Sequence, residues 1–161
     1  MGAEEMERIK KILADLGLHP EYLEHKAVIT SQEAAETRGF SLKQGVKALL
    51  FTNRADSWVI VNVPADMRVD QKKVAEKLGW SKGKTRMATE DEVMRKTGCQ
   101  IGAVPPFGHK ENIPIFFDPG IFENEMNSFN IGLRTNSVRI KSKELKVVFE
   151  KLDAVEGEFI R

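Results

Sequence analysis

Two β-rich runs near the middle of the chain constrain its fold more than any other feature. Val46–Thr52 and Trp58–Pro64 consist largely of valine, isoleucine, leucine and aromatic residues, which are enriched in strands. The polar segment 53–57 separates the two runs. This arrangement predicts a β-hairpin, and therefore a sheet at the centre of the fold.

Helices and shorter strands are predicted on both sides of the hairpin. Apolar residues recur at helical spacing from Met6 to Leu16, and Gly17 ends that helix. Capping residues predict four more helices, which begin near Thr30 (with Glu33), Asp70, Thr89 (with Glu92) and Ser142. The first three end at glycines and the last runs to Leu152; extended segments are expected at residues 22–28, 85–88, 113–118, 126–130 and 138–141.

Short strands interleaved with helices predict a mixed α/β or α+β domain with a curved sheet. The chain has 161 residues, and two domains of half that length would each have a small core. Neither an internal repeat nor a linker divides it, so residues 1–161 are expected to form a single domain. The pattern does not decide whether the sheet closes on itself.

Composition limits the classes of partner and site. The net charge is +1, so contact with nucleic acid has to depend on local basic clusters. Cys99 is the only cysteine, which excludes an internal disulfide and a thiolate metal cluster. The N-terminus lacks the apolar core of a signal peptide, and no apolar run approaches the ~20 residues of a membrane span. We expect a soluble, cytoplasmic protein without a membrane partner.

Several parts of the sequence resemble known chemical motifs but lack their spacing or context. Residues 79–85 read GWSKGKT, but the spacing differs from a phosphate-binding P-loop and a helix precedes it instead of a strand. A basic surface turn is the better interpretation, although this part of the chain could contact RNA through Lys72, Lys73, Lys77, Lys82, Lys84 and Arg86. The three histidines lack the short spacing of metal ligands, and Cys99 lacks a nucleophile signature. A metal hydrolase that uses the histidines would be distinguished by sensitivity to chelators.

Lys47 and residues 101–108 each allow two interpretations. Lys47 lies in the apolar run VKALLF; it is either a functional cation or a lysine that extends to solvent, and the pattern alone favours the second. Residues 101–108 read IGAVPPFG, which fits neither a helix nor a central strand. This segment is either a rigid structural turn or a loop whose glycines allow a ligand to approach the backbone and whose N–H groups point at it.

Several motifs in order resemble the YbaK/prolyl-tRNA synthetase editing-domain family, from about His25 to Leu145. The most specific is a GxxxP loop (residues 102–106) that follows a TG turn and lies downstream of a strand lysine. The elements are TSQEAA from Thr30, Lys47, VNVPADMRVD from Val61, KVAEKLG from Lys73, TGCQIGAVPPFG from Thr97, IFFD ending at Asp118, and FNIG ending at Gly132. The chain departs from typical members at FNIG, where many have a run of small residues before the glycine.

The resemblance implies a mixed α/β domain with a barrel-like sheet surrounded by helices. It also implies hydrolysis of mischarged tRNA, typically tRNA for proline carrying alanine, cysteine or serine, without a metal or cofactor. The partner would be the aminoacylated CCA end, with an aminoacyl-tRNA synthetase as a further candidate. A tRNA-binding module of the same fold that has lost turnover is the alternative.

Site residues are implied by the same resemblance. Lys47 would hold the terminal nucleotide or stabilise the reacting ester, while the backbone from Gly102 to Pro106 would grip the aminoacyl group and polarise its carbonyl. Residues expected near the substrate are Thr30, Ala103, Val104, Pro105, Phe107, Gly108, Asp118 and Gly132. An aminoacyl ester is already activated, so positioning, carbonyl polarisation and an assisting ribose hydroxyl would make a catalytic triad unnecessary.

Overall fold

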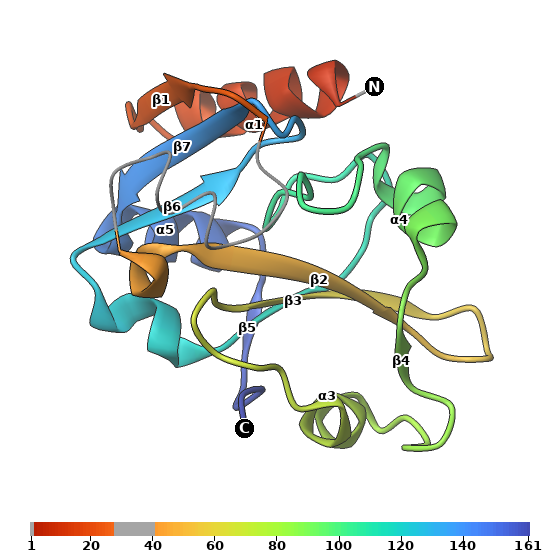
Figure 1. The fold of residues 1–161 in the computed structure, drawn as a ribbon. Coiled ribbons are helices and arrows are strands. Elements are labelled where there is room, and N and C mark those ends of the chain that lie inside the picture. The colour runs from red at the N-terminus through yellow and green to blue at the C-terminus, as the bar shows by residue number, and fades with distance from the viewer. Residues whose placement is uncertain (1, 28–40) are drawn as a thin grey trace.

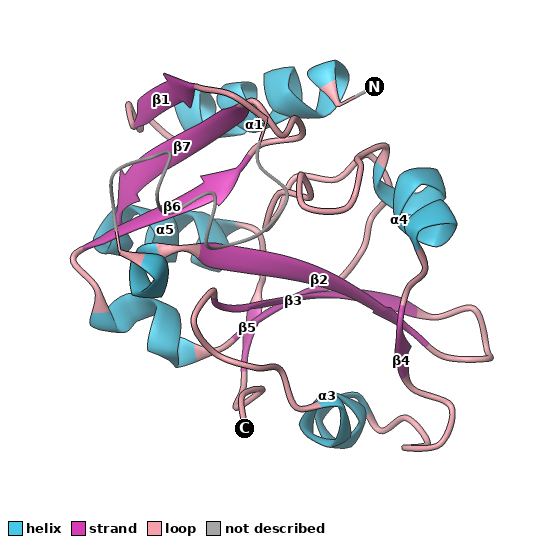
Figure 2. Cartoon of the chain, in the orientation of Figure 1, coloured by secondary structure: helices cyan, strands magenta, loops and turns pink. Residues whose placement is uncertain are grey.

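The strands form two sheets in a computed structural model that describes residues 2–27 and 41–161 (Figures 1 and 2). The order in the three-stranded sheet is β1-β7-β6, and in the five-stranded sheet it is β4-β2-β3-β5-β8. The strands are β1 (Glu21–Glu24), β2 (Val46–Thr52), β3 (Trp58–Pro64), β4 (Arg86–Met87), β5 (Ile115–Phe117), β6 (Met126–Asn130), β7 (Asn136–Lys141) and β8 (Val155–Glu156). The helices are α1 (Ala3–Asp15), α3 (Gln71–Leu78), α4 (Glu90–Thr97) and α5 (Ser142–Lys151), with 3₁₀ turns η1 (Leu42–Gln44) and η2 (Pro119–Glu123).

The mixed α/β expectation is confirmed, but the expectation of a barrel-like sheet is wrong. Within the described residues neither sheet closes on itself, and a single bridge between Gly45 and Ser128 joins the two. A closed barrel needs each outer strand to pair along its length. The outer strands β4 and β8 have only two residues each, which is too short to continue the sheet around.

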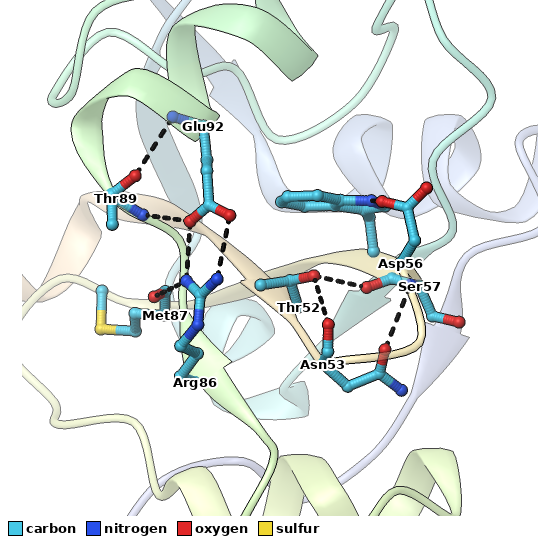
Figure 3. A network of polar contacts seen from close by, with 9 residues as sticks. Thr52, Asn53, Asp56, Ser57, Arg86, Met87, Thr89 and Glu92 are labelled. Carbon is cyan, nitrogen blue, oxygen red and sulfur yellow. Dashed lines mark hydrogen bonds and ion pairs between the residues drawn. The ribbon is translucent and has the colours of Figure 1, made fainter.

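The β2–β3 hairpin forms with the predicted bounds, and local side chains hold its turn. The register runs from Val46 opposite Pro64 to Thr52 opposite Trp58. The side chain of Asn53 accepts from the N–H groups of Ala55 and Ser57, at 2.9 and 3.1 Å. Figure 3 shows this turn beside the start of α4. The ladder of hydrogen bonds between the two strands stops where the strands end, and the polar side chain of Asn53 binds the backbone of the turn in its place.

Two of the predicted helix caps are confirmed and one is wrong. The Asp70 carboxylate accepts from Lys72 N–H, and Thr89 and Glu92 form a reciprocal capping box. Arg86 makes a bidentate ion pair with Glu92, at 2.7 and 2.9 Å, and this pair with the cap lowers the pKa of Glu92 to about 2 (Figure 3). Ser142 does not cap α5; its hydroxyl instead donates to the Asn124 carbonyl and accepts from Asn127.

Two further helices follow the expectations closely. Helix α1 begins and ends near the predicted bounds, and α5 runs to Lys151. The segment expected at residues 22–28 is the shorter strand β1. The helix predicted from Thr30 lies outside the described residues. None of the described helices has the length and apolar character needed to cross a membrane.

The two faces of β2 and β3 pack against different parts of the molecule. Leu49, Phe51 and Val63 belong to a cluster that includes Val74 of α3. On the opposite face, Ala48 and Leu50 pack with Ala103 and Val104 of the loop after α4. A third cluster lies around the three-stranded sheet, with residues from α1 and α5. The hairpin therefore separates α3 from the loop that carries the GxxxP sequence.

Candidate functional site

Glycines and prolines give the segment after α4 its path. Gly98 ends α4 in the left-handed conformation, with φ of 71°, and Gly102 and Gly108 also have positive φ values, 83° and 76°. Pro105 and Pro106 are buried between them. Glycine adopts such backbone angles without the clash that a Cβ would cause. The segment therefore follows a fixed irregular path across the hairpin.

Carbonyl groups of this segment accept hydrogen bonds from distant residues. Asn62 of β3 donates to Pro106 O at 3.0 Å, and Asn130 of β6 donates to Gly102 O. Arg134 donates twice to Ile101 O, at 2.9 and 2.6 Å. The backbone N–H of Gly132 donates to Ala103 O at 3.0 Å.

The N–H groups of the segment are less fully used. Ala103 N–H donates to Gln100 O at 3.0 Å. The N–H groups of Gly102, Val104 and Phe107 donate to no described residue. A backbone N–H that lacks a protein acceptor is normally satisfied by water or by a ligand. Gly102 is partly exposed, so its N–H can stabilise negative charge on a bound oxygen, whereas Phe107 is fully buried.

Lys47 lies at the start of β2, opposite Val63 in the register. Side chains alternate along a strand, so Lys47 is on the face of Leu49 and Phe51, whereas the GxxxP loop covers the other face. Burial lowers the pKa of Lys47; nearby Asp66 raises it and Arg68 lowers it further. Lys47 is a half-buried cation without a hydrogen bond to any described residue.

The remaining predicted site residues have well-defined structural contacts. Phe107 is fully buried and makes edge-to-face contacts with Phe129 and Phe149. The buried Asp118 carboxylate accepts from the N–H groups of Gly120 and Phe159, at 2.8 and 2.9 Å. These contacts explain their residue types without a substrate. Thr30 lies outside the described residues.

Gly108 and Gly132 pack against α1. A Cβ on Gly108 would lie 2.7 Å from the Ile9 side chain, and one on Gly132 would lie 2.5 Å from the Gly2 carbonyl. The φ of Gly132 is 114°. Both glycines are therefore packed closely against the N-terminal helix and the residue before it. Their substrate roles stay predictions.

The sequence interpretation missed three side chains that hold the loop. Asn62 carried a usable signal, because an amide in the middle of the apolar run WVIVNVP needs a partner when buried. Asn130 is part of the FNIG motif, but its contact with Gly102 spans 28 residues. The role of Arg134 could not be recognised from the sequence, because arginine is a common residue in surface turns.

Two other titratable residues near the loop, Cys99 and His109, supply neither an activated nucleophile nor a metal site. Burial raises the pKa of Cys99 to about 11, so its thiol is protonated and unreactive. Burial lowers the pKa of His109 to about 4, which the nearby Pro105 carbonyl only partly offsets, and its ring nitrogens make no hydrogen bond with a described residue. No group of three potential metal ligands occurs within residues 2–27 and 41–161.

Comparison with known proteins decides the family. A profile described as aminoacyl-tRNA editing domain matches residues 25–147. The chain belongs to this family. It is 30% identical over 142 residues to the multifunctional Ser/Thr-tRNA deacylase ProXp-y of Escherichia coli K12, covering 86% of this chain and 84% of that protein.

Two further relatives place this editing domain in context. The chain is 33% identical over 103 residues to the proline–tRNA ligase of Trichlorobacter lovleyi, which covers 64% of this chain and 17% of the ligase. A crystal structure described as a candidate trans-editing enzyme for prolyl-tRNA synthetase superposes with a TM-score of 0.82 and 26% identity, covering 98% and 97% of the two chains. The enzymatic class of this editing domain is aminoacyl-tRNA deacylase.

Proposed function

We propose that this editing domain removes alanine, cysteine or serine wrongly attached to tRNA for proline, acting in trans on the aminoacylated CCA end. The similarity to the Ser/Thr-tRNA deacylase ProXp-y supports serine as one substrate, and the similarity to a proline–tRNA ligase supports tRNA for proline. The observation that carries the proposal is the GxxxP loop, whose carbonyl groups are engaged while the N–H groups of Gly102, Val104 and Phe107 lack a described acceptor.

In the proposed reaction, water adds to the carbonyl carbon of the aminoacyl ester. The carbon–oxygen bond to the terminal ribose then breaks, the ribose oxygen takes up a proton, and free amino acid and tRNA are released. Negative charge develops on the carbonyl oxygen, where backbone N–H groups stabilise it most effectively. The neighbouring ribose hydroxyl orients the water, so the protein supplies positioning instead of a general base.

Lys47 has a separate part in this proposal. It binds a phosphate or the sugar of the terminal nucleotide, because its face of β2 differs from the face that the loop covers. Its flexible four-carbon stem allows an ammonium to reach a phosphate beyond the strand. Burial disfavours the bare cation, and a bound phosphate would compensate for that cost.

Discrimination among amino acids depends on the shape of the loop. Ala103 and Val104 offer little side-chain bulk and are held in the apolar cluster with Leu50. The ring of a correctly attached proline is bulkier, and its secondary amine donates fewer hydrogen bonds. A pocket that discriminates between substrates by size alone gives a ~10- to 200-fold difference in rate, and we expect a selectivity in this range.

The experiment is a single-turnover deacylation panel. Alanyl-, seryl-, cysteinyl-, threonyl- and prolyl-tRNA for proline are compared at equal enzyme concentration, with the wild-type protein. We expect the three small residues to be released ~10- to 200-fold faster than proline. Prolyl ester cleaved as fast as the others would contradict the specificity, and tight tRNA binding without hydrolysis of any ester would indicate a non-catalytic tRNA-binding module.

A further inference from the structure

The turn between β6 and β7 holds the GxxxP loop through three alternating residues. Asn130 donates its amide to Gly102 O, Gly132 donates its backbone N–H to Ala103 O, and Arg134 donates two N–H groups to Ile101 O. Three consecutive carbonyl groups of the loop are therefore bound by one short segment.

Each bound carbonyl fixes the direction of an N–H group. A trans peptide unit is planar, so the carbonyl of one residue and the N–H of the next point in opposite directions within one plane. The described chain contains no cis peptide bond. Fixing the carbonyls of Ile101, Ala103 and Pro106 consequently fixes the N–H groups of the residues that follow, Gly102, Val104 and Phe107.

These three N–H groups are the ones that donate to no described residue. By contrast, the carbonyl of Gly102, which Asn130 binds, fixes the Ala103 N–H, and that group donates to Gln100 O. We propose that Arg134 is a positioning residue for deacylation, because it aims the Gly102 N–H by holding the Ile101 carbonyl of the same peptide unit. This inference rests on the proposed function.

The chemistry of Arg134 suits this role. Its planar guanidinium places two donors on one carbonyl oxygen, at 2.9 and 2.6 Å, whereas a lysine would supply a single point charge. A cation on the carbonyl also polarises the peptide unit, which strengthens the N–H on its other side as a donor. In this proposal Arg134 acts on the substrate only through the peptide unit that it holds.

The test compares Arg134→Met, Arg134→Lys and a matched control, Arg139→Met. Arg139 lies in β7 and makes no hydrogen bond with the loop. We expect Arg134→Met to lower the single-turnover rate ~10- to 100-fold, the cost of a slightly misplaced group, with the Kd for tRNA changed less than about twofold. Arg134→Lys should fall between Met and wild type, and Arg139→Met should match wild type.

Amide hydrogen exchange of residues 101–107 supplies a readout that is independent of activity. Exchange should be faster in Arg134→Met than in Arg139→Met. A wild-type rate in a folded Arg134→Met, or equal losses in the Met variants of Arg134 and Arg139, would overturn the proposal. If Arg134→Met does not fold, Arg134→Lys carries the test, and unchanged kcat in it together with unchanged exchange would overturn it.

Failure of the proposed function gives a different result. A wild-type protein that hydrolyses no ester, but whose loop exchanges faster in Arg134→Met, would overturn deacylation while leaving the loop contact intact as a structural one. Loss of tRNA affinity at unchanged kcat would show that Arg134 acts in binding, which also overturns the positioning role.

Discussion

The GxxxP loop and the basic segment 72–86 differ in how their polar groups are bound. In the loop, donors from distant segments hold carbonyl groups, as Asn62 does for Pro106 and Arg134 for Ile101. In the basic segment, Lys82 contacts Glu76 at 2.9 Å, and both side chains are more than half exposed. Lys73 is an exception, because its ammonium donates to the distant Ile160 O at 2.7 Å.

This difference indicates where each region can contribute to function. Exposed ion pairs contribute ~0 to 1 kcal/mol and are screened by salt, so Lys82 can exchange the Glu76 carboxylate for an RNA phosphate at little cost. The loop cannot change its shape without breaking several distant bonds at once. We therefore expect the loop to control the rate of hydrolysis and the basic segment to influence only affinity.

The strongest test of this contrast places the same substitution in both regions. Gly102→Val puts a β-branched residue at φ of 83°, which should lower the hydrolysis of every ester in the panel by at least ~100-fold because the backbone is displaced. Gly83→Val is the control, since a Cβ there meets nothing within 4 Å. Single-turnover rates of the two variants would show the contrast, and equal losses would contradict it.

A second test compares a half-buried cation with an exposed one. Lys47→Ala should leave thermal unfolding nearly unchanged and lower deacylation by ~100-fold, the cost of one preorganised electrostatic contact. Lys84→Ala, an exposed lysine of the basic segment, should keep the wild-type rate. Near-wild-type hydrolysis by a folded Lys47→Ala variant would remove Lys47 from the site.

His109, which follows the loop, links stability to pH. Its pKa is lowered from 6.5 to about 4 in the folded protein, so the unfolded chain binds more protons between these values and stability falls as the pH drops from about 6.5 towards 4. The loss should reach ~2 to 3 kcal/mol at pH 4.5. Urea unfolding at pH 7 and 4.5 should show a smaller loss in His109→Gln; equal losses in both proteins would contradict the assignment.

The smallest effect is expected in the basic segment itself. Charge reversal of Lys82 and Lys84 should weaken tRNA binding and reduce the slope of log K against log salt by ~1 for each phosphate that the variant no longer neutralises. Filter binding at several salt concentrations measures this. An unchanged slope would mean that the segment is an ordinary solvated surface, and hydrolysis at saturating tRNA should be unaffected in either case.

The sequence predicts local structure in this chain much better than it predicts the site. The hairpin bounds, the Asp70 and Thr89 caps and β6 depend on neighbouring residues, so propensity and capping rules identify them. The loop's partners depend on tertiary contacts, and Arg134 looks like any surface arginine until the fold brings it to Ile101. The position of Lys47 on the face of β2 opposite the loop could likewise be assigned only from the structure.

The order of strands in the sheets has a consequence for synthesis of the protein. β1 pairs with β7, so that Glu21 lies opposite Arg139, and β8 adds to β5 only after all three strands of the other sheet have been made. Pairing between distant segments slows folding, because loop closure comes before the contacts that compensate for it. A nascent chain on the ribosome therefore keeps β1 without its partner until β7 has emerged, and one edge of β5 stays unpaired until β8 follows, so these two edges are the last parts of the sheets to be completed.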